Sequence, residues 1–169
     1  MRKRVSILGS GISGVGAAIL AKDKGYEVFV SDSNEITSNV KNKLDFISIP
    51  WEENKHSYAE LKKSDLVIKS PGISNESEII VKLKNSKVKI ISEIEFASTH
   101  TNSFIIGVTG SNGKTTTTKL IYHILKNSGL NIGIAGNIGT SFSKQIAENK
   151  FDYYVLEISS FQLDDIVDF

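Results

Sequence analysis

The chain carries the stretch Thr109-Gly110-Ser111-Asn112-Gly113-Lys114-Thr115 between an apolar run and a segment of helical periodicity. The run Phe104–Thr109 predicts a buried strand, and residues 115–127 place apolar side chains at the spacing of a helix. A glycine-rich turn between a strand and a helix collects backbone N–H groups at the helix N-terminus, where the helix dipole favours an anion. The stretch therefore predicts a loop that binds the phosphates of a nucleoside triphosphate.

Two side chains of this loop suit ATP chemistry. Lys114 places a positive charge near the outer phosphates, and Thr115 offers a hydroxyl to Mg²⁺. The loop is tighter by one residue than the general pattern G-x-x-x-x-G-K-[ST], because Val108 stands where that pattern has its first glycine. An ordinary strand-to-helix turn is the alternative, but such a turn requires neither the lysine nor the run of threonines that follows.

Composition narrows the class of protein. The chain has 169 residues, of which 40% are hydrophobic, and its 20 basic and 19 acidic residues give a net charge of +1. This balance favours neither nucleic acid nor a membrane surface as a partner. The absence of cysteine excludes disulfides and thiolate metal sites, and no apolar stretch approaches the roughly 20 residues that span a bilayer. We expect a soluble, cytoplasmic protein.

A second glycine-rich turn lies near the start of the chain. Residues 5–8 and 27–30 predict strands on either side of a helix at 14–24, and the first strand is followed by Gly9–Gly14, a G-x-G-x-x-G motif. In such a βαβ unit the glycines allow a diphosphate to approach the helix N-terminus, and Asp32 is placed to accept a hydrogen bond from a ribose hydroxyl. A close-packed turn without a ligand is the alternative.

Further strands and helices alternate along the chain. The run Leu66–Lys69 predicts a strand, and Ser70-Pro71-Gly72 follows it at the sheet edge where open α/β folds bind ligands, although a bare turn explains the same residues. Glu157 ends another apolar strand, a position from which a carboxylate can reach Mg²⁺ beside a phosphate loop. The other predicted elements are a helix at 76–85, strands at 88–91 and 131–134, a turn at 136–139, and a helix at 141–148. This alternation predicts parallel sheets in both halves, with a domain boundary between about residues 92 and 103.

Four segments carry a resemblance to a known family. They are Ser92–Phe96, Gly107–Thr115, Gly136–Gly139 and Leu156–Leu163, and the last of these is the most specific. Their order and spacing resemble the Mur ligases of peptidoglycan synthesis, and in particular the members that add D-glutamate. The resemblance covers essentially the whole chain. It implies an α/β fold with a Rossmann-like parallel-sheet domain at 1–93, followed at 94–169 by the first part of a P-loop α/β central domain.

The resemblance implies an ATP-dependent carboxylate–amine ligase of cell wall biogenesis, and hence of cell shape and division. Such an enzyme joins D-glutamate to UDP-N-acetylmuramoyl-L-alanine through an acyl phosphate and uses ATP and Mg²⁺. It works in the cytoplasm without nucleic acid or membrane, as a monomer when full length. The first domain then binds UDP, so a nicotinamide cofactor is not expected.

The resemblance also assigns site residues. ATP is expected on Gly110, Ser111, Asn112, Gly113, Lys114, Thr115 and Thr116, with Lys114, Thr115 and Glu157 as catalytic residues and Thr115 and Glu157 as metal ligands. The UDP-sugar is expected on Gly11, Ile12, Ser13, Asp32, Ser33, Asn34, Ser70, Pro71, Gly72, Asn137, Ser159 and Gln162. Ser159 and Gln162 have a second interpretation as a helix cap and a polar first turn.

Members of the family continue past the point that corresponds to Phe169, so the resemblance implies an N-terminal part of a longer enzyme. The remainder holds the carbamylated lysine and the histidine of the metal sites, the ATP base contacts and most of the D-glutamate site. We expect the 169-residue chain alone to bind the UDP-sugar weakly and to form no amide. A central sheet of three strands would also leave an unpaired edge and exposed apolar surface.

Other classes of protein remain open at this point. A sister Mur ligase or a folylpolyglutamate synthetase relative would share the phosphate loop, although the second leaves the N-terminal domain without a role. A non-catalytic nucleotide-binding module would need only the loops. An NAD-dependent oxidoreductase would explain Gly9–Gly14 and Asp32 but not the second loop.

Overall fold

The first half of the chain forms a parallel sheet from short apolar strands. The computed structural model describes residues 2–169. The strands β1 (Arg4–Leu8), β2 (Glu27–Ser31), β3 (Trp51–Glu52), β4 (Leu66–Lys69) and β5 (Lys89–Ser92) lie in the order β3-β2-β1-β4-β5, and every pairing is parallel. The parallel sheet predicted for this half is therefore confirmed.

Helices cover both faces of this sheet. They are α1 (Ile12–Asp23), α2 (Ser38–Phe46), α3 (Tyr58–Leu61) and α4 (Glu78–Asn85). Leu61 of α3 and Ile80 and Leu83 of α4 pack with Leu8 and Val67 on one face, and α1 covers the other. The sequence prediction omitted α2, α3 and β3, because these elements are short and bury little; Leu44 is the one fully buried residue of α2.

The second half forms a smaller parallel sheet. Its strands β6 (Phe104–Val108), β7 (Ile132–Gly136) and β8 (Tyr153–Glu157) lie in the order β6-β8-β7. The central strand β8 is apolar on both faces: Tyr154 and Leu156 join the main core, whereas Val155 packs with residues of α6 (Lys114–Asn127). Two more helices, α7 (Phe142–Glu148) and α8 (Ser160–Leu163), complete this half.

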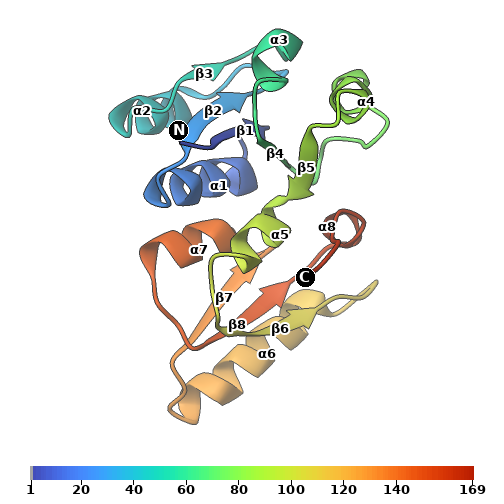
Figure 1. Cartoon of the computed structure of the whole chain (residues 1–169). Coiled ribbons are helices and arrows are strands. Elements are labelled where there is room, and N and C mark those ends of the chain that lie inside the picture. The colour runs from blue at the N-terminus through green and yellow to red at the C-terminus, as the bar shows by residue number, and fades with distance from the viewer. Residues whose placement is uncertain (1) are drawn as a thin grey trace.

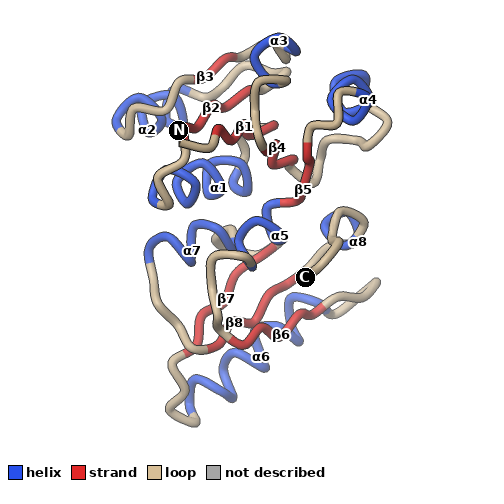
Figure 2. The backbone as a smooth tube through the Cα atoms, viewed as in Figure 1, coloured by secondary structure: helices blue, strands red, loops and turns tan. Residues whose placement is uncertain are grey.

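A helical layer joins the two sheets. The helix α5 (Glu93–Ser98) follows β5 directly, and α1, α5 and α7 lie between the sheets while α6 lies on the far side of the second one (Figures 1 and 2). A Cβ on Gly16 of α1 would lie 1.9 Å from the Ser141 Oγ before α7, so the two helices are in close contact. One hydrophobic cluster runs from Ile7 of β1 to Leu156 of β8. The two halves therefore share a core.

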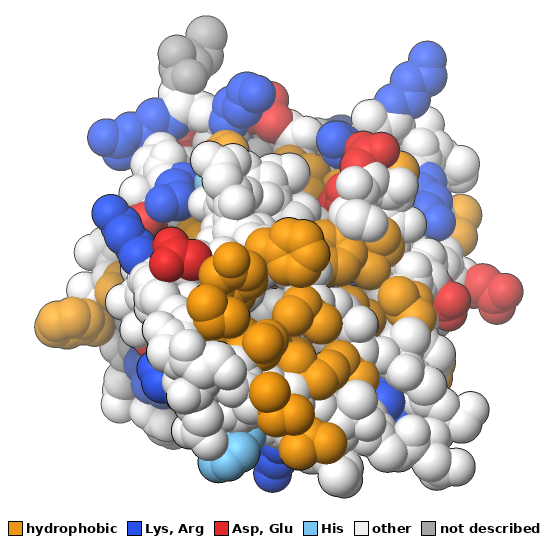
Figure 3. All heavy atoms as spheres, turned by 90° about the horizontal axis from the view of Figure 1, so that it is seen from below, with side chains coloured by type: hydrophobic (Ala, Val, Ile, Leu, Met, Phe, Trp, Pro, Cys, Tyr) orange, Lys and Arg blue, Asp and Glu red, His pale blue; other side chains and the backbone are white. Residues whose placement is uncertain are grey.

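The outer face of the second sheet is apolar. Phe104 of β6 and Leu120 and Ile124 of α6 are 64%, 56% and 53% exposed. Figure 3 views the molecule from this end and shows hydrophobic side chains gathered across the centre of the face. Within residues 2–169, β6 pairs with β8 alone. A three-stranded sheet with an unpaired edge and exposed apolar surface was the sequence expectation, and the structure confirms it. In the described part of the chain, no helix combines the length and apolarity of a membrane span.

Candidate functional site

The stretch Thr109–Thr115 forms a loop between β6 and α6. Its two glycines adopt conformations that disfavour other residues, with φ of +147° at Gly110 and +76° at Gly113, which caps the helix. Among the hydrogen bonds of residues 2–169, none is donated by a backbone N–H of residues 111–116. The loop therefore presents a set of unpaired donors at a helix N-terminus, and this arrangement suits a phosphate group.

Three side chains meet at the mouth of this loop, and that of Lys114 contacts the loop backbone. The Thr115 hydroxyl donates to Glu157 Oε2 at 2.6 Å, and Asn137 Nδ2 donates to Glu157 Oε1 at 3.0 Å. Glu157 is only 2% exposed. Lys114 Nζ donates to the Gly110 carbonyl at 2.6 Å, so its ammonium group lies over the loop. The hydroxyl and carboxylate oxygens of Thr115 and Glu157 are hard donors of the kind that Mg²⁺ prefers.

The turn that carries Asn137 is pressed against the end of β8. The Asn137 N–H donates to the Glu157 carbonyl at 2.8 Å, and Gly136 has a φ of +104°. A Cβ at Gly136 would lie 2.2 Å from that same carbonyl oxygen. The glycine is therefore required for the backbone approach that brings Asn137 to the Glu157 side chain, a contact that the sequence prediction did not include.

The first glycine-rich turn is tightly closed. A Cβ on Gly14 would lie 1.9 Å from the Gly9 carbonyl oxygen, whereas one on Gly11 would meet no atom within 4 Å. No backbone N–H of residues 11–14 donates a hydrogen bond within the described chain. The turn thus has open space and free N–H donors at the N-terminus of α1. These donors belong to the segment that contains Gly11, Ile12 and Ser13, which are predicted to bind the UDP-sugar.

Asp32 holds this turn in place. Its Oδ2 accepts hydrogen bonds from the Ser10 N–H at 2.7 Å and the Ser10 hydroxyl at 2.6 Å, and its Oδ1 accepts from the Asn34 N–H at 2.9 Å. Burial opposes ionisation of Asp32, but the hydrogen bonds from Ser10 and Asn34 outweigh it and lower the pKa of the carboxyl group. The sequence prediction gave Asp32 a ligand contact; in the structure its carboxylate also organises the turn.

A cavity opens beside two of the residues that are predicted to bind the UDP-sugar. It has a volume of about 560 Å³ and is lined by Ser33 and Gly72, and also by His56, Tyr58 and Ser77. His56 follows β3 and is not among the site residues predicted from the sequence. Its Nδ1 lies 2.7 Å from the Ser31 hydroxyl, and burial lowers the pKa of its imidazole despite the nearby charges of Asp32 and Glu52. No motif marks His56, because its position depends on the irregular segment after β3.

The remaining predicted residues lie in two places. Ser70 packs beneath the first turn, where a Cβ on Gly9 would lie 2.6 Å from its hydroxyl oxygen. Ser159 and Gln162 form a capping box at the start of α8, in which the Ser159 N–H donates to Gln162 Oε1 at 2.9 Å. The structure therefore agrees with the interpretation of Ser159 and Gln162 as a helix cap. Gln162 is also buried, with 4% of its surface exposed.

Two glycine-rich turns with unpaired N–H donors, each at a helix N-terminus beside a parallel sheet, place the chain in the α/β class and suit two phosphate-bearing ligands. Two family models match the chain: the MurD N-terminal domain matches residues 4–79, and the Mur ligase middle domain matches residues 108–169. The chain belongs to the Mur ligase family.

Similar proteins agree with this assignment. The UDP-N-acetylmuramoylalanine--D-glutamate ligase of Bacteroides fragilis is 54% identical over 99% of the chain, and that of Christiangramia forsetii is 51% identical over 100% of it. The chain spans 38% of the length of each relative. The solved UDP-N-acetylmuramate-alanine ligase of Thermotoga maritima is 25% identical, with a TM-score of 0.58 over 92% of this chain and 37% of that one.

Proposed function

We propose that this chain provides the UDP-sugar site and the ATP phosphate site of an enzyme that adds D-glutamate to UDP-N-acetylmuramoyl-L-alanine. The observation that carries the proposal is the group formed by Lys114, Thr115 and the buried Glu157 at a loop of free N–H donors. It supports a triphosphate site on the second sheet. The free donors of residues 11–14 support a separate diphosphate site on the first.

The chemistry joins a carboxylate to an amine. A carboxylate oxygen of the UDP-sugar attacks the γ-phosphorus of ATP, the bond to the bridging oxygen breaks, and ADP leaves. The amine of D-glutamate then attacks the acyl phosphate carbonyl, phosphate leaves, and the nitrogen loses a proton to give the amide. The first step brings an anion against a polyanion, and this repulsion is its main obstacle.

The residues of the loop address that obstacle. The Lys114 ammonium and the N–H groups of residues 111–116 would stabilise the charge that spreads over the transferring phosphoryl oxygens. Thr115 and Glu157 would hold Mg²⁺, which neutralises phosphate charge when it is bound. Asn137 orients the Glu157 carboxylate through its hydrogen bond to Oε1.

Calorimetric titration tests the two-site proposal. The chain is titrated separately with UDP-N-acetylmuramoyl-L-alanine, with ATP in the presence of Mg²⁺, and with NAD. We expect binding of the first two at independent sites and no binding of NAD. Preference for NAD would contradict the assignment of the first turn. ADP release that requires both the UDP-sugar and D-glutamate would show that the chain is an active ligase by itself rather than a binding module.

A further inference from the structure

The segment after α8 is joined to the first sheet by a buried ion pair. The Asp165 carboxylate lies 2.6 Å from the Lys69 ammonium group, and the two side chains are 9% and 3% exposed. Asn75 Nδ2 donates to the other oxygen of Asp165 at 2.8 Å. Lys69 ends β4 and Asn75 lies in the loop that leads from β4 to α4, so one carboxylate contacts the start of that loop and a point farther along it.

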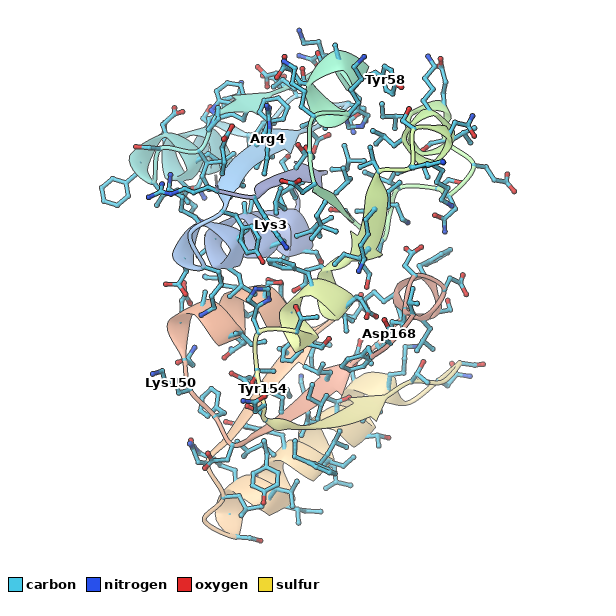
Figure 4. All side chains as sticks on the ribbon, in the orientation of Figure 1. Lys3, Arg4, Tyr58, Lys150, Tyr154 and Asp168 are labelled. Carbon is cyan, nitrogen blue, oxygen red and sulfur yellow. The ribbon has the colours of Figure 1, made fainter. Side chains whose placement is uncertain are left out.

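The same segment is also fixed on its other side. The backbone N–H groups of Val167 and Asp168 donate to the Glu95 carboxylate of α5 at 3.0 Å and 3.2 Å. Glu95 is 5% exposed. Figure 4 labels Asp168 at this junction, close to α5 and α8. The end of the chain therefore has a defined position relative to both β4 and α5.

The ion pair connects two groups of residues that the family resemblance assigns to one ligand, the UDP-sugar. Lys69 Nζ also donates to the Ile73 carbonyl at 2.7 Å, and this bond closes the loop that carries Ser70, Pro71 and Gly72. On the other side, Asp165 follows α8, which begins after Ser159 and contains Gln162. A cavity of about 390 Å³ separates the two groups and is lined by Pro71 and Gly72 of the loop and by Phe161 of α8.

Stability alone is a weak reason for a buried ion pair. The free-energy cost of transferring two charges from water into the protein offsets most of the attraction between them. Apolar residues of similar volume often stabilise a fold equally well. Lys69 and Asp165 also lie outside the phosphate loop and the first turn. The ion pair sets the distance between the Ser70–Gly72 loop and α8. These two elements come from different halves of the molecule.

We propose that Lys69 and Asp165 are positioning residues for the UDP-sugar. The pair holds α8 against the Ser70–Gly72 loop, so that the part of the site for the sugar and its peptide is formed before the ligand binds. A preformed site avoids the free energy of ordering these elements on binding. UDP alone occupies only the part of the site that lies on the first sheet, so its binding does not require α8. The inference rests on the proposed function.

Asp165→Ala provides the test, because Asp165 stands on the α8 side of the pair and the bond from Lys69 to Ile73 remains. The full 169-residue chain and the variant are titrated with UDP-N-acetylmuramoyl-L-alanine and, separately, with UDP. We expect the affinity for the UDP-sugar to fall about tenfold, and the affinity for UDP to change less than about twofold. Lys24→Ala is the control, because it removes an exposed ion pair with Asp23 at the far end of α1 and should alter neither affinity.

The outcomes separate the inference from the proposed function. Equal losses for both ligands, or no loss for either, would overturn the positioning role while leaving the proposed function in place. Failure of the unaltered chain to bind either ligand would overturn both. If Asp165→Ala does not fold, Asp165→Asn replaces it, since the amide oxygen keeps an acceptor for one of the two partners, Asn75 or Lys69. We then expect a loss of about threefold for the UDP-sugar alone, and an unchanged UDP-sugar affinity would overturn the inference.

Discussion

Lys114 is the residue on which phosphate binding should depend most. Its ammonium group bonds to the Gly110 carbonyl and can exchange that partner for a phosphate oxygen. A hydrogen bond to a charged group is worth about 1.5–3 kcal/mol, so Lys114→Ala should weaken ATP binding by tenfold or more in calorimetric titration. UDP-sugar binding should stay unchanged. Lys126→Ala, at the other end of α6, is the matched control, and loss of both ligands in Lys114→Ala would contradict two separate sites.

Gly14 and Gly11 of the first turn should respond differently to substitution by alanine. Gly14→Ala places Cβ 1.9 Å from the Gly9 carbonyl oxygen, so it should destabilise the fold by several kcal/mol or prevent folding. Gly11→Ala meets no protein atom within 4 Å and should keep the melting temperature within a few degrees. It should nevertheless weaken UDP binding, because the methyl group occupies space beside the free N–H donors. A normal affinity for UDP in Gly11→Ala would place the diphosphate elsewhere.

Some contacts of these site residues could be predicted from the sequence, and others could not. The contact between Thr115 and Glu157 joins residues 42 positions apart, yet it could be anticipated because Glu157 ends one parallel strand and Thr115 lies in the first turn of the helix that follows the adjacent strand. The bond from Asn137 to Glu157 could not, because it depends on how closely Gly136 approaches β8. Local patterns identify the edge of a sheet, whereas the contacts across that edge depend on three-dimensional packing.

At the scale of elements, the contact between α5 and the start of α7 contains a buried acid. Glu93 Oε1 accepts from the Ser143 N–H, and Oε2 has no hydrogen-bond partner among residues 2–169. Burial raises the pKa of this carboxyl group from 4.5 to about 7, although the hydrogen bonds from Ser143 oppose the change. The folded state therefore holds a proton between these two pH values that the unfolded state has released.

This difference predicts how stability depends on pH. Because the folded pKa is the higher one, the contribution of Glu93 to the free energy of unfolding should fall as pH rises from 4.5 to about 7, and then level off. Glu93→Gln cannot ionise, so its stability relative to the unaltered chain should increase over that range, by at most about 3 kcal/mol. Thermal unfolding at a series of pH values measures the difference. A constant difference between Glu93→Gln and the unaltered chain over this pH range would refute the interpretation.

Strands and helices could be predicted from the sequence where their buried residues follow a regular pattern. Each strand from β4 to β8 was anticipated within two residues at either end, because these strands are short, apolar and bounded by turn residues. The helix α5 was not recognised as a helix, since its residues are buried all round and show no amphipathic period; Glu93, Ile94, Glu95, Phe96 and Ala97 are all buried. It is nevertheless the element that joins the two sheets.

At the scale of the whole molecule, the two halves have one continuous core but different outer surfaces. The helices α1, α5 and α7 bury apolar side chains from both sheets, so the turn on α1 and the loop on α6 are parts of one framework. The outer face at β6 and α6 has no such cover within residues 2–169. Alternating strands and helices indicated the two sheets, but the shared core depends on side-chain contacts such as Gly16 with Ser141, which no local pattern shows.

The exposed face should control how the chain behaves in solution. Contiguous apolar surface next to an unpaired strand edge favours association between copies. Leu120 and Ile124 are one helical turn apart on α6 and more than half exposed, so Leu120→Lys with Ile124→Lys should remove little buried contact and add charge to this face. We expect light scattering to show less concentration-dependent association, with UDP-sugar binding unchanged. Phe46→Lys places the same charge on an 89% exposed side chain of α2, away from this face, and should not reduce association. If it reduced association as strongly, net charge rather than the apolar face of β6 and α6 would be responsible.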